Sequence, residues 1–309
     1  MDRVRGISRH RFLRLAAVAS AAALLPFRGG SAREKMFERL IPSSGERVPV
    51  VGLGTWQAFD VGPDADDRAR LARVVNAFFD SGGRVIDSSP MYGRAEQTVG
   101  DLLTERDGGS DPFIATKVWT RGREDGIRQM ARSAERLGRP RIDLMQVHNL
   151  LDWRVHLATL RAWKNEGKIR YLGVTHYTSD ALDEIARLVE TEALDFVQIA
   201  YSVTVRDAER RLLPTAADNG TAVIVNRPFE GGGIFRAVRK RPLPGWAAEF
   251  ECESWSQAFL KYLLGHPAVT CVIPGTGNPR HMNDNVRAGF GSLPDGLTRR
   301  RMAQYFDDL

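Results

Sequence analysis

Cysteine is scarce in this sequence, which has only Cys252 and Cys271 among its 309 residues. No motif places cysteine or histidine side chains at metal-ligand spacing, so the sequence predicts no metal centre. Cys271 lies in the apolar run AVTCVIPG, where a cysteine serves as a small buried core residue. A disulfide between the two cysteines is an alternative only if the protein is exported.

Lysine is also rare, with six lysines against 38 arginines. The formal net charge of +6 and a pI near 9.6 would suggest a nucleic-acid partner, but the charge is unevenly distributed. Residues 1–32 carry six arginines and one aspartate, a net charge of +5, which leaves +1 for the rest of the chain. A nearly neutral body predicts no phosphate-binding surface and hence no nucleic-acid partner. We interpret the late run Arg299-Arg300-Arg301 as a solvated helix face.

The N-terminal apolar stretch, Leu15 to Leu25, is too short to span a bilayer comfortably. It follows a basic start and precedes Pro26 and the small residues Gly30-Ser31-Ala32, which is the layout of a cleaved secretory signal. The segment SRHRFLR resembles the twin-arginine export signal, with His10 at the second arginine position. We expect residues 1–32 to engage the export machinery and lead to the periplasm. The alternative is an N-terminal tail on a cytoplasmic protein.

A glycine-rich dinucleotide-binding turn is missing, because GLGTW at residues 52–56 lacks the third glycine and the helix start that such a turn requires. Short apolar runs instead alternate with segments of helical periodicity. The eight runs are VPVVGLG, RVIDSS, PFIATKV, IDLMQVHN, IRYLGVT, LDFVQIAYS, AVIVNRPF and VTCVIPGT. Eight such units predict an α/β fold, a (β/α)₈ TIM barrel formed by residues 33–309 as a single domain. The stretch MFERLIPSSGERVPV predicts an N-terminal β-hairpin that caps the bottom of the barrel.

Polar residues close three of these runs, and the C-terminal strand ends of such a barrel converge on one face. Asp87 and Tyr92 follow the second run, Lys117 closes the third and His148 the fourth. An ammonium beside a phenol lowers the pKa of the phenol, and Asp87 would keep Lys117 charged. Tyr92 then becomes a proton donor and His148 orients the substrate oxygen. This combination suits an oxygen that gains negative charge, as when a hydride adds to a carbonyl.

Three motifs, in this order, resemble those of the aldo-keto reductase superfamily: Asp-Ser-Ser-Pro-Met-Tyr-Gly at residues 87–93, then ATKVW, then MQVHN. The resemblance extends from about Phe37 to Val286. It implies an NAD(P)H-dependent enzyme that reduces a small aldehyde or ketone to an alcohol, with Tyr92 as the general acid. Two alternatives stay open: a cofactor-binding redox sensor or regulatory protein on the same barrel with little turnover, and a sugar or alcohol dehydrogenase that works in the oxidative direction.

The resemblance also implies a nicotinamide cofactor across the barrel mouth, with NADPH favoured over NADH. It places Gly54 and Thr55 near the cofactor, and Thr175, His176 and Gln198 at the carboxamide. Asn226 replaces the aromatic residue that usually stacks on the nicotinamide, and Arg227 would reach the pyrophosphate. It also places Gly275, Thr276, Arg280, His281 and Asn285 at the adenosine phosphate end of the cofactor. The substrate pocket would be lined by Trp56, Met91, Trp119 and Asn149.

Overall fold

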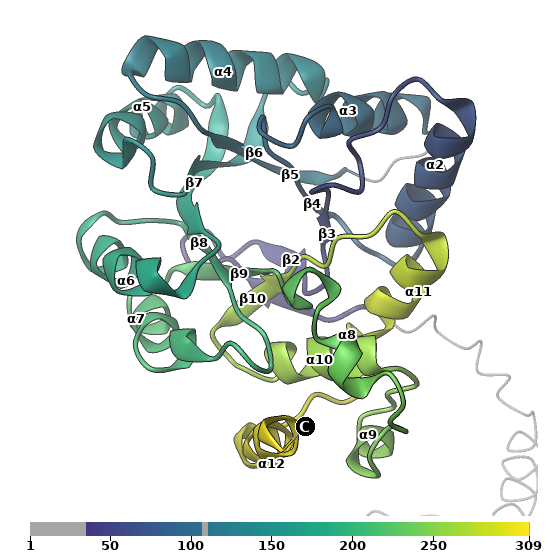
Figure 1. The fold of residues 1–309 in the computed structure, drawn as a ribbon. Coiled ribbons are helices and arrows are strands. Elements are labelled where there is room, and N and C mark those ends of the chain that lie inside the picture. Colours follow the sequence, from purple (N-terminus) through teal and green to yellow (C-terminus); the bar gives the residue numbers. More distant parts are fainter. Residues whose placement is uncertain (1–34, 107–110, 309) are drawn as a thin grey trace, which may run out of the picture. The chain divides into compact units, whose positions relative to one another are not determined.

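The structure, a computed structural model, describes residues 35–106 and 111–308, so the predicted signal at residues 1–32 lies outside the described residues. Eight parallel strands form one sheet in chain order (Figure 1). Bridges between Val51 and Val272 and between Gly54 and Gly275 join its first and last strands, which confirms the predicted (β/α)₈ barrel. The strands are β3 (Leu53–Gly54), β4 (Val85–Asp87), β5 (Phe113–Val118), β6 (Ile142–His148), β7 (Ile169–His176), β8 (Phe196–Ala200), β9 (Ala222–Asn226) and β10 (Val269–Val272).

Helices follow the strands and surround the barrel (Figure 1). In α2 (Ala65–Asp80), the Asp64 side chain caps the first turn, and an apolar stripe from Leu71 to Phe79 is buried. The other helices are α3 (Ala95–Glu105), α4 (Arg123–Arg136), α5 (Trp153–Asn165), α6 (Leu182–Thr191), α7 (Leu212–Asp218), α8 (Phe235–Val238), α9 (Trp246–Glu249), α10 (Trp255–Leu264), α11 (Pro279–Arg287) and α12 (Gly296–Asp307). Short 3₁₀ turns are η1 (Ser179–Ala181), η2 (Asp207–Glu209) and η3 (Glu230–Gly232).

The predicted hairpin is present as β1 (Glu38–Leu40) and β2 (Arg47–Pro49), which pair in antiparallel fashion. Ile41 and Val48 from this hairpin are buried in one apolar cluster with side chains of the barrel strands. The Arg39 guanidinium donates to the carbonyl of His266, in the loop before β10, at 2.9 Å. The hairpin thus covers the end of the barrel at which the strands begin.

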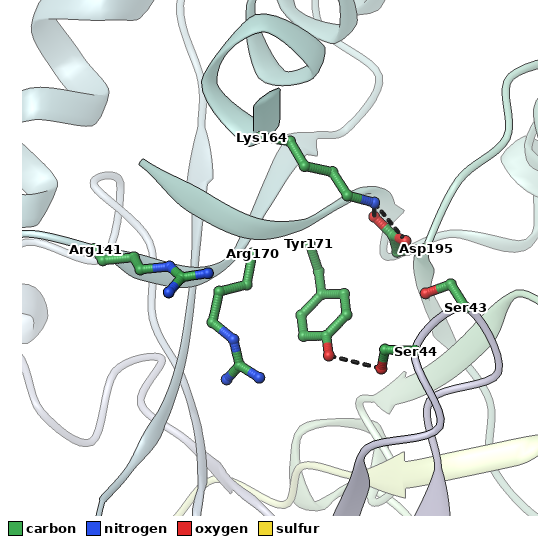
Figure 2. Close-up of a pocket in the computed structure, with 7 residues that line it drawn as sticks. All are labelled: Ser43, Ser44, Arg141, Lys164, Arg170, Tyr171 and Asp195. Carbon is green, nitrogen blue, oxygen red and sulfur yellow. Dashed lines mark hydrogen bonds and ion pairs between the residues drawn. The ribbon is translucent and has the colours of Figure 1, made fainter. Parts of the chain in front are cut away.

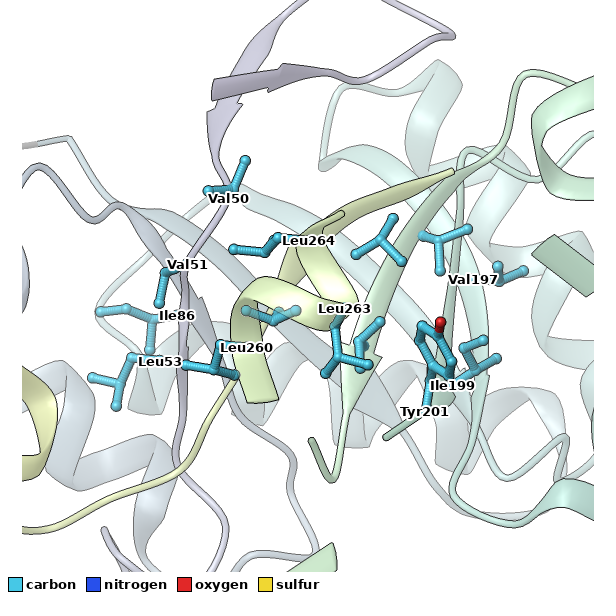
Figure 3. Close-up of a cluster of buried hydrophobic side chains, with 14 of the residues drawn as sticks. Val50, Val51, Leu53, Ile86, Val197, Ile199, Tyr201, Leu260, Leu263 and Leu264 are labelled. Carbon is cyan, nitrogen blue, oxygen red and sulfur yellow. The ribbon is translucent and has the colours of Figure 1, made fainter. Parts of the chain in front are cut away.

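Two apolar cores lie on the outer and inner faces of the barrel sheet. One contains residues such as Ile86, Val197 and Leu260 and fills the space between the barrel and its helices (Figure 3). The other contains Val85 and further inward-facing strand residues, such as Phe113 and Leu144, and lies inside the barrel. Because side chains alternate along a strand, Val85 and Asp87 point inward while Ile86 points outward. The inward side chains are therefore apolar near the strand starts and polar near the strand ends.

Arg299 on α12 corrects one sequence-based interpretation. Its guanidinium is buried, donates to the Tyr262 carbonyl at 2.9 Å and lies 2.7 Å from the Glu209 carboxylate. It also pairs with the hydroxyl of Tyr201. Arg300 and Arg301 are exposed as expected. The interpretation of the triplet as a solvated face is wrong for Arg299, because the amphipathic helix turns this arginine toward two tyrosines and a glutamate.

Both cysteines are free and buried, which confirms the expected burial of Cys271. In the part of the chain that the structure describes, no helix has the length and hydropathy of a membrane span. Over the same residues, no group of three or more histidine, cysteine, aspartate or glutamate side chains is arranged to hold a metal ion.

Candidate active site

A buried ion pair lies at the C-terminal ends of β4 and β5. Lys117 Nζ is 2.6 Å from Asp87 Oδ2 and 2.7 Å from the Ser88 carbonyl oxygen, and both charged side chains are almost fully buried. Burial is the largest single effect and favours the neutral amine, but Asp87 and Tyr92 together outweigh it, so the pKa of Lys117 lies above its ordinary value. The ammonium is therefore charged throughout the neutral range, as the sequence predicted.

Tyr92 lies in the turn after β4, with its ring facing the ion pair. Lys117 Nζ is 5.1 Å from the ring centroid, and the Tyr92 amide donates to the Ser89 carbonyl at 3.0 Å. The next residue, Gly93, has a φ of +61°, and a Cβ there would fall 2.3 Å from the Asp60 carboxylate. The left-handed φ favours glycine at position 93, so this residue helps to shape the turn that presents the phenol.

The pKa of Tyr92 contradicts the sequence-based prediction. Burial raises the pKa of this phenol, and the lowering effect of the Lys117 charge is too small to reverse it, partly because Asp87 acts in the upward direction. The predicted net decrease is therefore wrong, although Lys117 acts in the expected sense. Tyr92 is protonated at neutral pH, which is the state that a proton donor requires.

His148 completes the predicted group of four residues. Its ring lies 5.9 Å from that of Tyr92 in an edge-on arrangement, and its Nδ1 is 3.1 Å from Ser89 Oγ. Burial, followed by the charge of Lys117, lowers the pKa of His148 to about 2. The imidazole is therefore neutral. If Ser89 donates to Nδ1, then Nε2 carries the proton and can donate to a substrate oxygen.

Two glutamines also reach this group from across the barrel interior. Gln198 Nε2 donates to Asp87 Oδ1 at 2.7 Å, and Gln146 Nε2 donates to the same oxygen at 3.3 Å. Asp87, Gln146 and Gln198 belong to β4, β6 and β8, which are not neighbours in the sheet, so they meet only inside the barrel. Gln146 was not predicted as a site residue, although its place two residues before His148 puts it on the same face of β6.

The residues expected at the carboxamide form a linked set around Gln198. Thr175 Oγ1 and Asn226 Nδ2 each donate to Gln198 Oε1 at 3.3 Å. His176 is turned toward the following loop, where its Nδ1 accepts from the Thr178 amide at 3.3 Å. The Asn226 Oδ1 atom is buried and has no hydrogen-bond partner among the described residues. This acceptor is available to a bound ligand.

The first and last strands meet beside this set. The close approach of Gly54 to Gly275 requires glycine, because a Cβ on Gly54 would fall 2.7 Å from the Ile273 carbonyl. Thr55 is buried and donates to the Asp87 carbonyl at 3.0 Å, so its hydroxyl is committed to the strand end. Thr276 Oγ1 accepts from the Asn278 amide at 3.1 Å, just before α11 begins.

Three basic side chains expected to bind phosphate are solvent-accessible. Arg280 and His281 lie in the first turn of α11, which the Asn278 side chain caps, whereas Asn285 is buried one turn later. Arg227 follows β9 with a φ of +49°, and its guanidinium lies 5.9 Å from the exposed ring of Tyr177. A helix N-terminus with flanking arginines favours a phosphate group.

The four residues predicted to line the substrate pocket lie in loops after β3, β4, β5 and β6. Trp56, Met91 and Trp119 are 47%, 39% and 41% exposed, which is unusual for large apolar side chains. The Trp119 ring lies 6.5 Å from the His148 ring. Asn149 has a φ of +53°, and its buried Oδ1 has no partner among the described residues. These side chains offer an apolar wall and one polar contact beside His148.

A polar cavity of about 230 Å³ lies at the opposite end of the barrel, near the strand starts (Figure 2). Its lining includes Lys164, which is bound to Asp195 at 2.6 Å, and Arg170, which is bound to Asp143 at 2.7 Å. Lys164 and Arg170 therefore already have carboxylate partners. At this end of a barrel, such pairs commonly serve stability, so we do not count this cavity as part of the site.

Comparisons with known proteins agree with this geometry. The model of the "Aldo/keto reductase family" matches residues 50–296. The NADH-specific methylglyoxal reductase of Escherichia coli (strain K12) is 30% identical over 82% of this chain and 94% of its own length. The D-threo-aldose 1-dehydrogenase of a Pseudomonas species is 24% identical over 82% of this chain and 93% of its own.

Solved structures show the same fold. An aldo-keto reductase from Klebsiella pneumoniae in complex with NADPH superposes with a TM-score of 0.71 at 23% identity, over 88% of this chain and 95% of its own. The chain forms a closed parallel barrel of eight strands with a polar layer at the strand ends, and the family model matches most of its length. This chain belongs to the aldo/keto reductase family.

Proposed function

We propose that this protein is an NAD(P)H-dependent oxidoreductase that reduces an aldehyde or ketone to an alcohol, with Tyr92 as the general acid. The observation that carries the proposal is the position of a protonated phenol between the buried Lys117–Asp87 pair and a neutral His148.

The proposed roles follow from the contacts. His148 donates a hydrogen bond to the carbonyl oxygen and orients it toward the Tyr92 hydroxyl. As negative charge develops on that oxygen, Tyr92 transfers its proton to it, which completes the alcohol. Lys117 stabilises the phenolate that remains, and solvent returns the proton. A bound nicotinamide supplies the hydride that adds to the carbonyl carbon.

The residues at the mouth fit such a cofactor. The unpaired Asn226 Oδ1 can accept a hydrogen bond from a carboxamide N–H, and the capped N-terminus of α11 suits a phosphate. Arg227 is exposed at the end of β9 and can reach a pyrophosphate. We further propose that Arg280 or His281 pairs with a 2′-phosphate, which favours NADPH over NADH. The Escherichia coli relative is named as NADH-specific, so both cofactors belong in the test.

The test is a screen of the purified protein against aldehydes, ketones and quinones with NADPH and with NADH, followed by absorbance at 340 nm. We expect steady-state oxidation of NADPH with at least one class of carbonyl and weaker activity with NADH. A protein that completes a single hydride transfer but does not turn over would instead be the cofactor-binding sensor. Activity only with alcohols and the oxidised cofactor would make it a dehydrogenase.

We also propose that residues 1–32 direct export through the twin-arginine route, which carries folded proteins. Such a route would let the barrel close around its cofactor before it reaches a compartment without an evident supply of NADPH. The measurement is fractionation of the native host with and without a functional translocase. We expect a mature protein that begins near Arg33 in the periplasm and disappears when the translocase is deleted. Full-length protein confined to the cytoplasm would contradict this proposal.

A further inference from the structure

The Asp87 carboxylate has two differently occupied oxygens. Oδ2 contacts the Lys117 ammonium, whereas Oδ1 faces the barrel interior and accepts from two neutral amides, those of Gln146 and Gln198. We propose that Gln146 and Gln198 are positioning residues that hold Asp87 in the orientation that keeps Lys117 beneath Tyr92. The inference rests on the proposed function only in naming Tyr92 as the acid.

The two amides provide hydrogen-bond donors for the second oxygen of the buried Asp87 carboxylate. A carboxylate offers several acceptor sites, and one ammonium cannot satisfy both oxygens of a side chain that is almost fully removed from water. An unpaired buried oxygen is costly, and the carboxylate would rotate to share Lys117 between its oxygens. With two N–H donors on Oδ1, only Oδ2 is directed at Lys117, and the second contact of the ammonium, with the Ser88 carbonyl, is preserved.

Neutral donors also tune the field at Tyr92. Asp87 raises the pKa of Tyr92 and Lys117 lowers it. N–H dipoles directed at Oδ1 offset part of the carboxylate charge, so the field of the ammonium prevails more strongly at the phenol. A carboxylate or a methionine at position 146 would lack this effect. The other titratable groups that face this set from neighbouring elements are Glu96 on α3, His148 on β6, His176 on β7 and Cys271 on β10.

The orientation of the Gln198 amide is fixed by its other contacts. Its Oε1 accepts from Thr175 and Asn226, both at 3.3 Å, so its nitrogen must be the atom that faces Asp87. Gln198 Nε2 also lies 3.4 Å from Gln146 Oε1, which orients the second amide in turn. The hydrogen bonds therefore run without interruption from Asn226 at the mouth to the Lys117 ammonium.

The test measures the acidity of Tyr92 directly, without turnover. Tyrosines are replaced by 3-fluorotyrosine, whose phenol is more acidic, and the ¹⁹F signal of residue 92 is identified by its loss in Tyr92→Phe. We expect Gln146→Met, which keeps chain length but removes the donor, to raise the titration midpoint of residue 92 by about half a pH unit. The matched control is Gln257→Met. Gln257 is a buried glutamine on α10 that donates to Asp284 on α11 at 2.7 Å, far from Tyr92, so its replacement should leave the midpoint unchanged.

A second variant keeps the test decisive if Gln146→Met does not fold. Gln198→Met removes the shorter of the two contacts, so the midpoint should rise by at least as much. A midpoint equal to that of the wild type in whichever of these variants folds would overturn the proposal. Because the titration needs no substrate or cofactor, it can succeed even if no carbonyl is reduced. Failure of the proposed function and failure of this inference are therefore distinguishable.

Discussion

Replacement of Tyr92 by phenylalanine is expected to lower the turnover of carbonyl reduction by about a thousandfold or more, with cofactor affinity retained. The change removes only the hydroxyl and keeps the ring that lies beside Lys117 and His148. A positioned acid typically contributes about 10²–10⁴ in rate, and the described site offers no second O–H in the same place. The measurements are the single-turnover rate of hydride transfer and the dissociation constant of NADPH.

Tyr177→Phe is the matched control for that experiment. Tyr177 is an exposed tyrosine at the barrel mouth, and its ring stacks on His176 at 5.6 Å, a contact that phenylalanine retains. We expect near-native turnover from this variant. If Tyr92→Phe also keeps near-native turnover, Tyr92 is not the acid, and the role of the Lys117–Asp87 pair must be reconsidered.

Much of this arrangement could be predicted because it depends on local sequence. The apolar runs define the strands, and a polar residue at the end of a buried run must point toward the barrel mouth or a partner. Asp87, Lys117 and His148 could be identified on that basis, and the structure places all three at strand ends. Lys117 was the most informative, because a chain with 38 arginines and six lysines uses lysine sparingly.

The remaining features depend on contacts between strands that are far apart in the sequence. Gln198 belongs by resemblance to the cofactor site, but in the structure its nitrogen contacts Asp87, which lies 111 residues away. Gln146 looks like an ordinary polar residue in a strand until β4, β6 and β8 enclose a common interior. The direction of the Tyr92 pKa depends on how much water the phenol loses on folding, which no local pattern reveals.

Arg299 shows the same limit at the surface. A run of three arginines predicts a solvated face, but only the position of α12 against α10 and β8 decides which of the three is turned inward. The carboxylate that receives it, Glu209, lies 90 residues away in η2. Periodicity locates a helix and its apolar side, whereas the partner of a charged residue on that side depends on the closed fold.

Replacement of Lys117 by methionine is expected to have two separable effects, on stability and on catalysis. Loss of the ammonium leaves Asp87 buried without its cation, which typically costs about 3–5 kcal/mol in the free energy of unfolding. The folded-state pKa of Lys117 is raised, so the stability that it contributes is fully present below the ordinary lysine value of about 10.4 and is lost as the pH rises through the folded value. Urea denaturation at several pH values should therefore show the variant and the wild type converging only at high pH.

Loss of Lys117 is also expected to change the pH dependence of the reaction. Lys117 lowers the pKa of Tyr92, so its removal raises that pKa and moves the alkaline limb of the reduction profile to higher pH. The plateau rate falls at the same time, by about a hundredfold or more, because the phenol is a weaker acid and its phenolate has no ammonium beside it.

The double variant Asp87→Asn/Lys117→Met separates the effect on stability from the effect on catalysis. Removing both buried charges together should recover most of the lost stability, since no uncompensated ion remains, but none of the lost rate. An alkaline limb and a plateau that match the wild type in Lys117→Met would show that the ammonium does not act on Tyr92.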